Sequence, residues 1–322
     1  MIRAALTAGL FCTALPALAD PPQLSLPIDC QLGVDCYVQH YVDRDPGPGV
    51  QDFHCGKRSY DGHKGTDFAL TSLAAMQSGV NVLAATDGTV KARRDSMPDV
   101  FQGRPDAPDV SGRECGNGVV IDHGGGWESQ YCHLKRGSIR VEPGQTVNAG
   151  AILGQVGASG QSQFPHLHLV LRHDGAVIDP FDADQDLVCN DPKPDNIWKD
   201  PLPYTPGGLI ALGFDSKMPA YARIKAGEAA HPHLPAKAPA IVLWAYAYDS
   251  QPGDVLILEI NGPQGQLIRH ESQLKKHQDQ FFRAAGKRNK TGHWPKGAYQ
   301  GRAILQRGNK VLDQRRVKLT IP

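Results

Sequence analysis

The sequence predicts an all-β protein, in which a compact antiparallel β domain is followed by a β-sandwich of the immunoglobulin or fibronectin type. The chain of 322 residues contains 35 glycines and 25 prolines, a combination that helix-rich proteins avoid. Its apolar runs are short and are separated by turn residues, which is typical of strands. The length suits about two domains.

The composition excludes several classes of protein. Hydrophobic residues make up 40% of the chain and charged residues 21%, which is typical of a soluble folded protein and excludes a largely disordered one. The formal net charge is +1, which argues against a nucleic-acid binder that works through a global positive field. We therefore expect no nucleic-acid partner. Beyond the N-terminal segment we also expect no membrane span, because no stretch is long and apolar enough.

The N-terminal segment has the features of a secretory signal peptide. Arg3 supplies a positive charge, residues 4–15 are apolar, and residues 17–19 (Ala-Leu-Ala) fit the small-residue cleavage pattern. The apolar run is too short to cross a bilayer. We expect residues 1–19 to be removed, so that the mature chain begins near Asp20 in the periplasm or outside the cell.

The cysteines predict a disulfide framework. Six of the seven remain after residues 1–19 are removed, and an even number in an exported chain indicates disulfides. A structural zinc site is disfavoured because no C-x-x-C pair is present. Six cysteines allow many connectivities. In the one that we favour, the first pair closes a small loop, the second flanks a hairpin, and the third remains by elimination. These pairs are Cys30 with Cys36, Cys115 with Cys132, and Cys55 with Cys189.

The first domain is expected at residues 51–181, after an N-terminal extension at residues 20–50 that wraps on it. Within the domain, residues 124–126 (Gly-Gly-Gly) predict the turn of a hairpin. Residues 72–78 predict one short helix, and the Pro- and Asp-rich residues 95–114 predict a surface insertion. The first expected strand begins at residue 68. The other expected strands cover residues 80–85, 88–92, 119–123, 128–134, 145–147, 151–156 and 167–171.

A Pro- and Asp-rich linker at residues 182–208 is expected to lead into the β-sandwich at residues 209–322. There, strand signals recur at regular spacing, and the histidines are scattered. We interpret those histidines as surface or packing residues and this domain as an accessory one. Its expected strands cover residues 241–248, 254–261, 266–271, 280–284, 297–307 and 311–321.

Three short segments hold the residue types of a metal site. In the strand that contains His166 and His168, alternation places both imidazoles on one face. His63 and Asp67 form a second pair, separated by Lys-Gly-Thr, and His133 lies in a third segment. Two imidazoles and one carboxylate make a catalytic zinc shell whose fourth position is left for water, which zinc acidifies to a pKa of roughly 7. The remaining histidines suit proton transfer and stabilisation of an oxyanion.

These segments together resemble the lysostaphin/LytM-type zinc endopeptidases, which cut the peptide cross-links of bacterial peptidoglycan. The resemblance covers roughly residues 60–181. The matching stretches are H-x-x-x-D at residues 63–67, Y-x-H-L at residues 131–134, E-P-G-Q-x-V-x-A-G at residues 142–150, and G-A-S-G at residues 157–160 leading to H-L-H at residues 166–168.

The resemblance implies a role for each of five side chains. By this resemblance, the zinc ligands are His63, Asp67 and His168. The resemblance also implies that His166 and His133 are the catalytic pair outside the metal shell. We expect His166 to be the general base and His133 to stabilise the oxyanion.

Other polar residues near these segments receive plainer interpretations. Asn117 is a candidate for lining the substrate groove, because it follows Cys115 closely. His40 and His54 precede the domain and are expected at the surface.

The expected function is that of an exported zinc metalloendopeptidase acting on peptidoglycan stem peptides, with the sandwich positioning it on the wall or on a protein partner. Two alternatives stay open. One is a non-catalytic LytM-like regulator of other cell-wall hydrolases, and the other is a zinc peptidase that acts on proteins.

Overall fold

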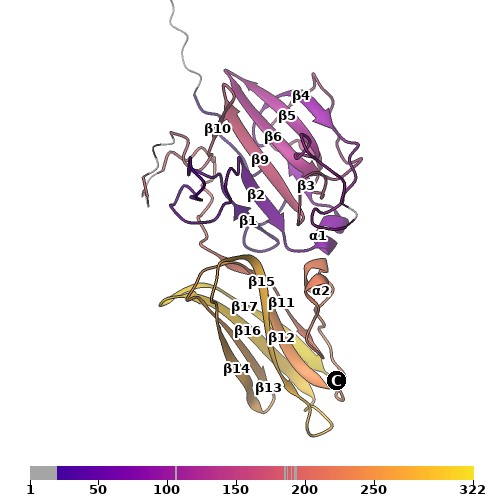
Figure 1. The fold of residues 1–322 in the computed structure, drawn as a ribbon. Helices are drawn as coiled ribbons and strands as arrows, with labels where there is room; N and C mark the ends of the chain where they lie inside the picture. The colour runs from indigo at the N-terminus through magenta and orange to yellow at the C-terminus, as the bar shows by residue number, and fades with distance from the viewer. Residues whose placement is uncertain (1–19, 106, 185, 187, 190, 192–193) are drawn as a thin grey trace, which may run out of the picture.

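The computed structural model describes residues 20–322 except residues 106, 185, 187, 190 and 192–193. The predicted signal peptide at residues 1–19 lies outside the described residues. Two β domains lie end to end (Figure 1), which we call the N-terminal domain (residues 20–205) and the C-terminal domain (residues 206–322). The prediction of an all-β chain is confirmed, since the described residues contain only two short helices. Neither helix is long and apolar enough to cross a membrane.

The N-terminal domain is built on one eight-stranded antiparallel sheet with the strand order β1-β2-β9-β6-β5-β4-β7, in which β10 also pairs with β9. A small second sheet consists of β3 (Asn81–Leu83) and β8 (Ile152–Gln155), and the helix α1 covers Leu73–Ser78. The strands of the large sheet are β1 (Cys36–His40), β2 (Thr66–Leu70), β4 (Gly88–Arg94), β5 (Asn117–Gly124), β6 (Trp127–Leu134), β7 (Thr146–Val147), β9 (His166–His173) and β10 (Ala176–Ile178).

Strand β9 shows how the sequence orients this sheet. Leu167, Leu169 and Leu171 alternate along it, and all three lie in the hydrophobic core with at most 2% exposure. His166 and His168 occupy the intervening positions and therefore face the other side. The predicted alternation thus gives the sheet one apolar face toward the core and one face that carries the two histidines.

The N-terminal extension differs from its prediction. Instead of only wrapping on the domain, Cys36–His40 forms the strand β1, which pairs antiparallel with β2 at the edge of the large sheet. Leu24 and Ile28 are also buried in the core of the domain. The strand is short and ends in Gln-His, so it has no polar-apolar alternation that would predict it.

The C-terminal domain is a sandwich of two antiparallel sheets, with the orders β11-β12-β15 and β14-β13-β16-β17. Both sheets contribute fully buried side chains to one core, among them Leu243, Leu258 and Leu305. The predicted strands are present, but β11 and the helix α2 were not expected from the sequence. The elements are β11 (Gly208–Asp215), α2 (Tyr221–Ala226), β12 (Ala240–Ser250), β13 (Val255–Gly262), β14 (Gly265–Gln273), β15 (Gln278–Arg288), β16 (Gly297–Arg307) and β17 (Lys310–Ile321).

Three disulfides cross-link the N-terminal domain. They are the pairs that the sequence favoured, so that prediction is confirmed. The bonds join Cys30 to Cys36, Cys55 to Cys189 and Cys115 to Cys132.

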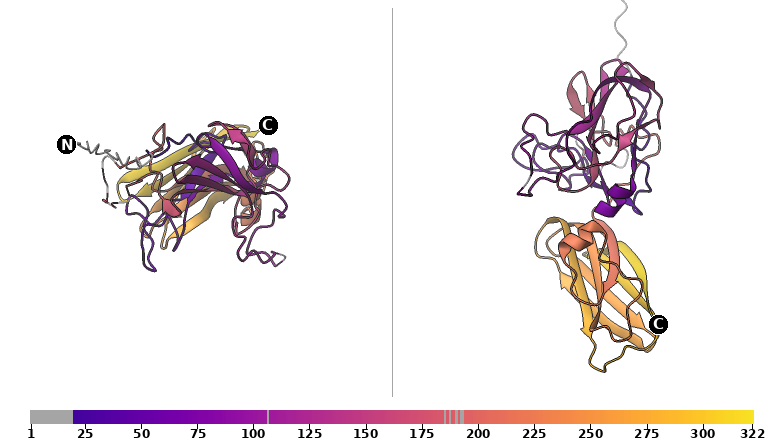
Figure 2. Two further views of the ribbon diagram at one scale, coloured as in Figure 1. Left: turned by 90° about the horizontal axis from the view of Figure 1, so that it is seen from above. Right: turned by 90° about the vertical axis from the view of Figure 1, so that its right-hand side faces the viewer.

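The two domains share a buried contact. Tyr37 of β1 stacks on Tyr248 of β12 with 4.5 Å between ring centroids, within an apolar cluster that draws on both domains. Arg58 is buried between the Tyr41 and Tyr248 rings, 5.0 Å from each centroid, and donates to the carbonyl oxygen of Thr205. Helices α1 and α2 face each other across the junction (Figures 1 and 2).

Candidate metal centre

The predicted ligands come together at neighbouring points of β2 and β9. Asp67 lies directly opposite His168 in the register of these strands, and His63 precedes β2 by one tight turn of chain. Gly65 makes this path possible. A Cβ atom there would lie 2.5 Å from the carbonyl oxygen of Leu169 and 2.8 Å from Cε1 of His168, so any side chain would push the strands apart.

The distances between the three ligand atoms fit a zinc ion. His63 Nε2 lies 3.1 Å from His168 Nδ1, which lies 2.8 Å from Asp67 Oδ1, and the third edge, between His63 Nε2 and Asp67 Oδ1, is 3.3 Å. Bonds of about 2.0–2.1 Å at tetrahedral angles place ligand atoms roughly 3.3 Å apart. His63 donates its Nδ1 hydrogen to the carbonyl oxygen of Tyr41 at 2.7 Å, which leaves Nε2 free to bind metal.

The electrostatics keep the carboxylate charged. Burial alone would raise the pKa of Asp67, but His63 and the hydrogen bonds with His168 and His40 outweigh it and hold that pKa well below its usual range. The Asp67 carboxylate is therefore an anionic ligand at neutral pH.

The predicted catalytic pair lies beside these ligands. The His133 and His166 rings are 4.6 Å apart, and His166 Nε2 lies 3.6 Å from Asp67 Oδ1. His166 Nδ1 donates to the carbonyl oxygen of Phe164, and His133 Nδ1 to that of Ser159, both at 2.8 Å. In the neutral rings, each Nε2 then carries a lone pair and accepts protons.

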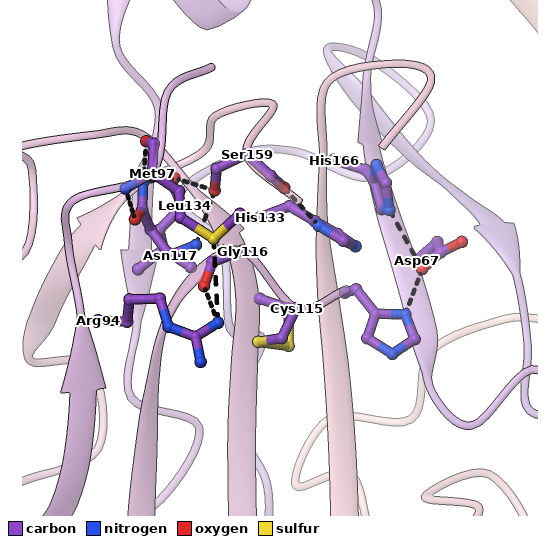
Figure 3. Close-up of a disulfide and its surroundings, with 12 residues drawn as sticks. Asp67, Arg94, Met97, Cys115, Gly116, Asn117, His133, Leu134, Ser159 and His166 are labelled. Carbon is purple, nitrogen blue, oxygen red and sulfur yellow. Dashed lines mark hydrogen bonds and ion pairs between the residues drawn. A yellow bond between two sulfur atoms is a disulfide. The ribbon is translucent and has the colours of Figure 1, made fainter. Parts of the chain in front are cut away.

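Burial keeps both rings neutral. It lowers the pKa of His166 to about 4, and burial together with the neighbouring His166 and His168 lowers the pKa of His133 well below its ordinary value. His133 also has a left-handed backbone, with a φ of 64° at the end of β6, which is uncommon for a residue other than glycine. Figure 3 shows His133, His166 and Asp67 beside the Cys115 disulfide.

One histidine beside Asp67 was not expected from the sequence. His40 was expected at the surface, but it is only 7% exposed, and its Nδ1 lies 3.1 Å from Asp67 Oδ2. Burial would lower the pKa of His40, but the nearby carboxylates of Asp279 and Asp67 outweigh it and raise this pKa to about 9. A charged His40 therefore contacts one carboxylate oxygen of Asp67, and Oδ1 is the oxygen that faces His63 and His168. Only the pairing of β1 with β2 brings it there.

Asn117, the candidate for shaping the substrate groove, lies inside the domain. Its side chain is fully buried, accepts from the backbone nitrogen of Met97 at 2.8 Å, and donates to the carbonyl oxygens of Met97 and Leu134 (Figure 3). Asn117 therefore ties the start of the insertion to the end of β6. The other histidine expected at the surface, His54, is half-buried against the Tyr204 ring, 4.4 Å away.

Comparisons with known proteins relate part of this chain to one peptidase family. Residues 61–180 match the model of peptidase family M23. The peptidoglycan DD-endopeptidase ShyA of Vibrio cholerae is 33% identical over 131 residues, which are 41% of this chain and 25% of ShyA. The DD-carboxypeptidase/endopeptidase Mpg of Neisseria meningitidis is 31% identical over 118 residues, 37% of this chain and 22% of Mpg. The chain thus spans only about a quarter of the length of these relatives.

Among solved structures, the catalytic domain of the prophage-encoded M23 protein EnpA from Enterococcus faecalis is 24% identical. It covers 47% of this chain and 92% of its own, with a TM-score of 0.33.

Proposed function

We propose, on the premise that residues 61–180 are a domain of peptidase family M23, that this chain is an exported zinc metalloendopeptidase that hydrolyses the peptide cross-links of bacterial peptidoglycan. The observation that carries the proposal is the convergence of His63, Asp67 and His168, whose ligand atoms lie 2.8–3.3 Å apart beside two neutral histidines. The names of the relatives ShyA and Mpg support peptidoglycan as the substrate. In a periplasm, the D-Ala–diaminopimelate bond is the natural target.

Three side chains would hold the metal, through His63 Nε2, His168 Nδ1 and Asp67 Oδ1. When bound, zinc acts as a Lewis acid and lowers the pKa of a coordinated water to roughly 7. His40 supports this arrangement by holding the second oxygen of Asp67, so that the carboxylate cannot rotate away.

His166 is the proposed general base. As the attacking water forms its bond to the scissile carbonyl carbon, His166 Nε2 takes up the water proton. The same nitrogen then delivers that proton to the leaving amine when the carbon–nitrogen bond breaks. The hydrogen bond from Nδ1 to the Phe164 carbonyl oxygen keeps the ring aligned and stabilises the transient positive charge.

His133 faces the same space and is proposed to stabilise the oxyanion. Its Nδ1 hydrogen is already donated to Ser159, so its Nε2 becomes a donor only after it takes up a proton. The proposed role therefore requires His133 to be charged while the tetrahedral oxyanion exists. Burial opposes that charge in the free protein, and the negative oxyanion would favour it.

Export is part of the proposal. Three disulfides in the N-terminal domain suit an oxidising compartment, and the apolar N-terminal run with its Ala-Leu-Ala site suits a cleaved signal peptide. Together they favour the periplasm or the outside of the cell.

The test is digestion of purified sacculi by the chain that begins at residue 20, followed by mass spectrometry of the released muropeptides. We expect cross-linked muropeptides to be converted to monomers, the reaction to stop with a chelator, and added zinc to restore it. Release of nothing, with zinc fully bound, would favour the non-catalytic regulator. Cleavage of casein with intact sacculi would favour a protein-directed peptidase.

A further inference from the structure

A cavity of about 510 Å³ opens next to the metal ligands, and both domains line it. On one side it reaches Asp67 and His166 of the N-terminal domain. On the other side it is lined by Tyr221, Lys225, Asp279 and Gln280 of the C-terminal domain. A substrate that reaches the reacting centre through this cavity would contact both domains.

The C-terminal wall of the cavity is held firmly against the catalytic sheet. Gln280 donates to the Tyr37 hydroxyl oxygen at 3.0 Å and to Gln39 Oε1 at 3.2 Å. Gln39 in turn donates to the backbone carbonyl oxygen of Asp279 at 3.1 Å. Since Tyr37 also stacks on Tyr248, the wall is anchored by polar and apolar contacts to β1.

Asp279 is connected to the metal site. His40 lies between two carboxylates, with Nδ1 3.1 Å from Asp67 Oδ2 and Nε2 3.7 Å from Asp279 Oδ1. The Asp279 side chain lines the cavity and is 61% exposed, and its Oδ1 also lies 3.8 Å from Nε2 of His277. The negative charge of Asp279 is therefore separated from the Asp67 carboxylate by the His40 ring.

Lys225 supplies the opposite charge. Its Nζ lies 4.9 Å from the centre of the Tyr221 ring, which stacks on Phe282, so the start of the C-terminal domain fixes the position of the lysine stem. Among the residues that the structure describes, no carboxylate lies within ion-pair distance of Lys225 Nζ. The ammonium group is exposed at the cavity and keeps its hydrogen-bond capacity.

We propose that the C-terminal domain forms one wall of the substrate groove and selects a zwitterionic peptide, with Lys225 binding a free carboxylate and Asp279 binding a free ammonium group. The inference rests on the proposed function and deepens it, since it names the chemical features of the peptide that the site selects. The sandwich is then part of the active site and more than an accessory module.

The test measures peptide binding by calorimetry to the zinc-loaded full chain carrying His133→Ala, so that the probe is not consumed. The probe is an N-acetylated tetrapeptide with one lysine side chain and a C-terminal D-Ala. Two capped forms complete the set, one with a C-terminal amide and one with an acetylated lysine. We expect each cap to weaken binding by about tenfold, as charge-assisted hydrogen bonds of this kind imply.

Two variants separate the two charges. Lys225→Met is expected to abolish the difference between the carboxylate and the amide, and Asp279→Asn to abolish the difference between the free and the acetylated lysine. The matched control is Lys310→Met, on exposed β17 outside the lining of the cavity, which should keep both differences.

Three outcomes would overturn the inference. The first is an affinity that neither cap changes, and the second is a Lys225→Met chain that still binds the carboxylate more tightly than the amide. The third is a Lys310→Met chain that no longer distinguishes the capped from the uncapped peptides. Loss of zinc from the Asp279→Asn chain would make Asp279 a positioning residue for His40 and overturn its binding role. Because binding does not require turnover, these results stand apart from the digestion of sacculi that tests the proposed function.

Discussion

The two domains solve the problem of stability in different ways. Among the described residues of the N-terminal domain no strand exceeds eight residues and β7 has two, whereas the strands of the C-terminal domain run from eight to twelve residues. All six cysteines after residue 19 lie in the N-terminal domain. The long strands of the C-terminal domain bury their apolar faces without any disulfide. The N-terminal domain, which has short strands and holds the candidate metal centre, is cross-linked by disulfides.

Both domains bury carboxylates, but the N-terminal domain also gathers buried histidines around one of them. The N-terminal domain buries His63, Asp67, His133 and His166, and each of them has a hydrogen-bond or ion-pair partner. Burying such groups costs several kcal/mol when they are unpaired. The N-terminal domain thus holds a fixed array of donors and acceptors, and its three disulfides stabilise the fold that carries this array.

The largest effect is expected from His168→Ala. Removal of one of three ligands should abolish both zinc retention and hydrolysis, with a loss of activity of at least about a thousandfold, because the Lewis acid contributes several kcal/mol. The C-terminal domain should stay folded. Metal analysis and a digestion assay check this, and a His168→Ala chain that stays fully zinc-loaded and active would refute the ligand assignment.

His133→Ala should separate catalysis from metal binding. We expect activity to fall by about 10²–10⁴-fold while zinc is retained, since His133 lies outside the ligand set. The matched control is His123→Ala on neighbouring β5, whose ring bonds to the Asp87 carbonyl oxygen and to Ser129. Equal losses of activity in both variants would indicate a general packing effect.

Loss of the long-range disulfide should affect one domain only. The double substitution Cys55→Ser, Cys189→Ser opens a loop of sequence separation 134 and is expected to lower the free energy of unfolding of the N-terminal domain by about 4–5 kcal/mol. Denaturant unfolding followed by fluorescence should then show an earlier transition for Trp127 and Trp198, in the core of the N-terminal domain, and an unchanged one for Trp294, in the core of the C-terminal domain. A shift of both transitions together would show that the domains unfold as one unit.

The smallest effect concerns a buried carboxyl of the N-terminal domain. Burial, partly offset by the Phe181 backbone hydrogen bond and Arg44, raises the pKa of Asp179 from 3.8 to about 7. The folded state therefore holds a proton that the unfolded state loses between these values, so stability falls as pH rises through this window.

Asp179→Asn should remove this slope, which is at most about 1.4 kcal/mol per pH unit. Unfolding measured at pH 5.5 and 6.5 checks it, with the exposed Asp184→Asn as the control that should keep the slope. An Asp179→Asn chain with an unchanged slope would assign the pH dependence to other groups.

The sequence predicted those features that depend on residues close together in the chain. Alternation in β9 placed His166 and His168, the spacing of His63 and Asp67 suggested a pair of ligands, and the resemblance joined them. The positions of His40 and Asp279 could not be predicted in this way. Each reaches the site only through contacts of β1. This strand pairs with β2 and meets the C-terminal domain through the Tyr37–Tyr248 stack and the Gln39–Asp279 hydrogen bond, and all of these partners are far away in the chain.

Asn117 shows a second limit. Its place after Cys115 suggested a groove, but a side chain with one acceptor and two donors suits a buried link between loops equally well. The sequence does not show which backbone groups lie within its reach.

The bond between Cys55 and Cys189 has one more consequence. It closes a covalent ring that contains His63, Asp67, His133, His166 and His168. A single proteolytic cut in the exposed stretch near residues 103–105 would therefore leave the two fragments joined, and they would separate on a gel only after reduction.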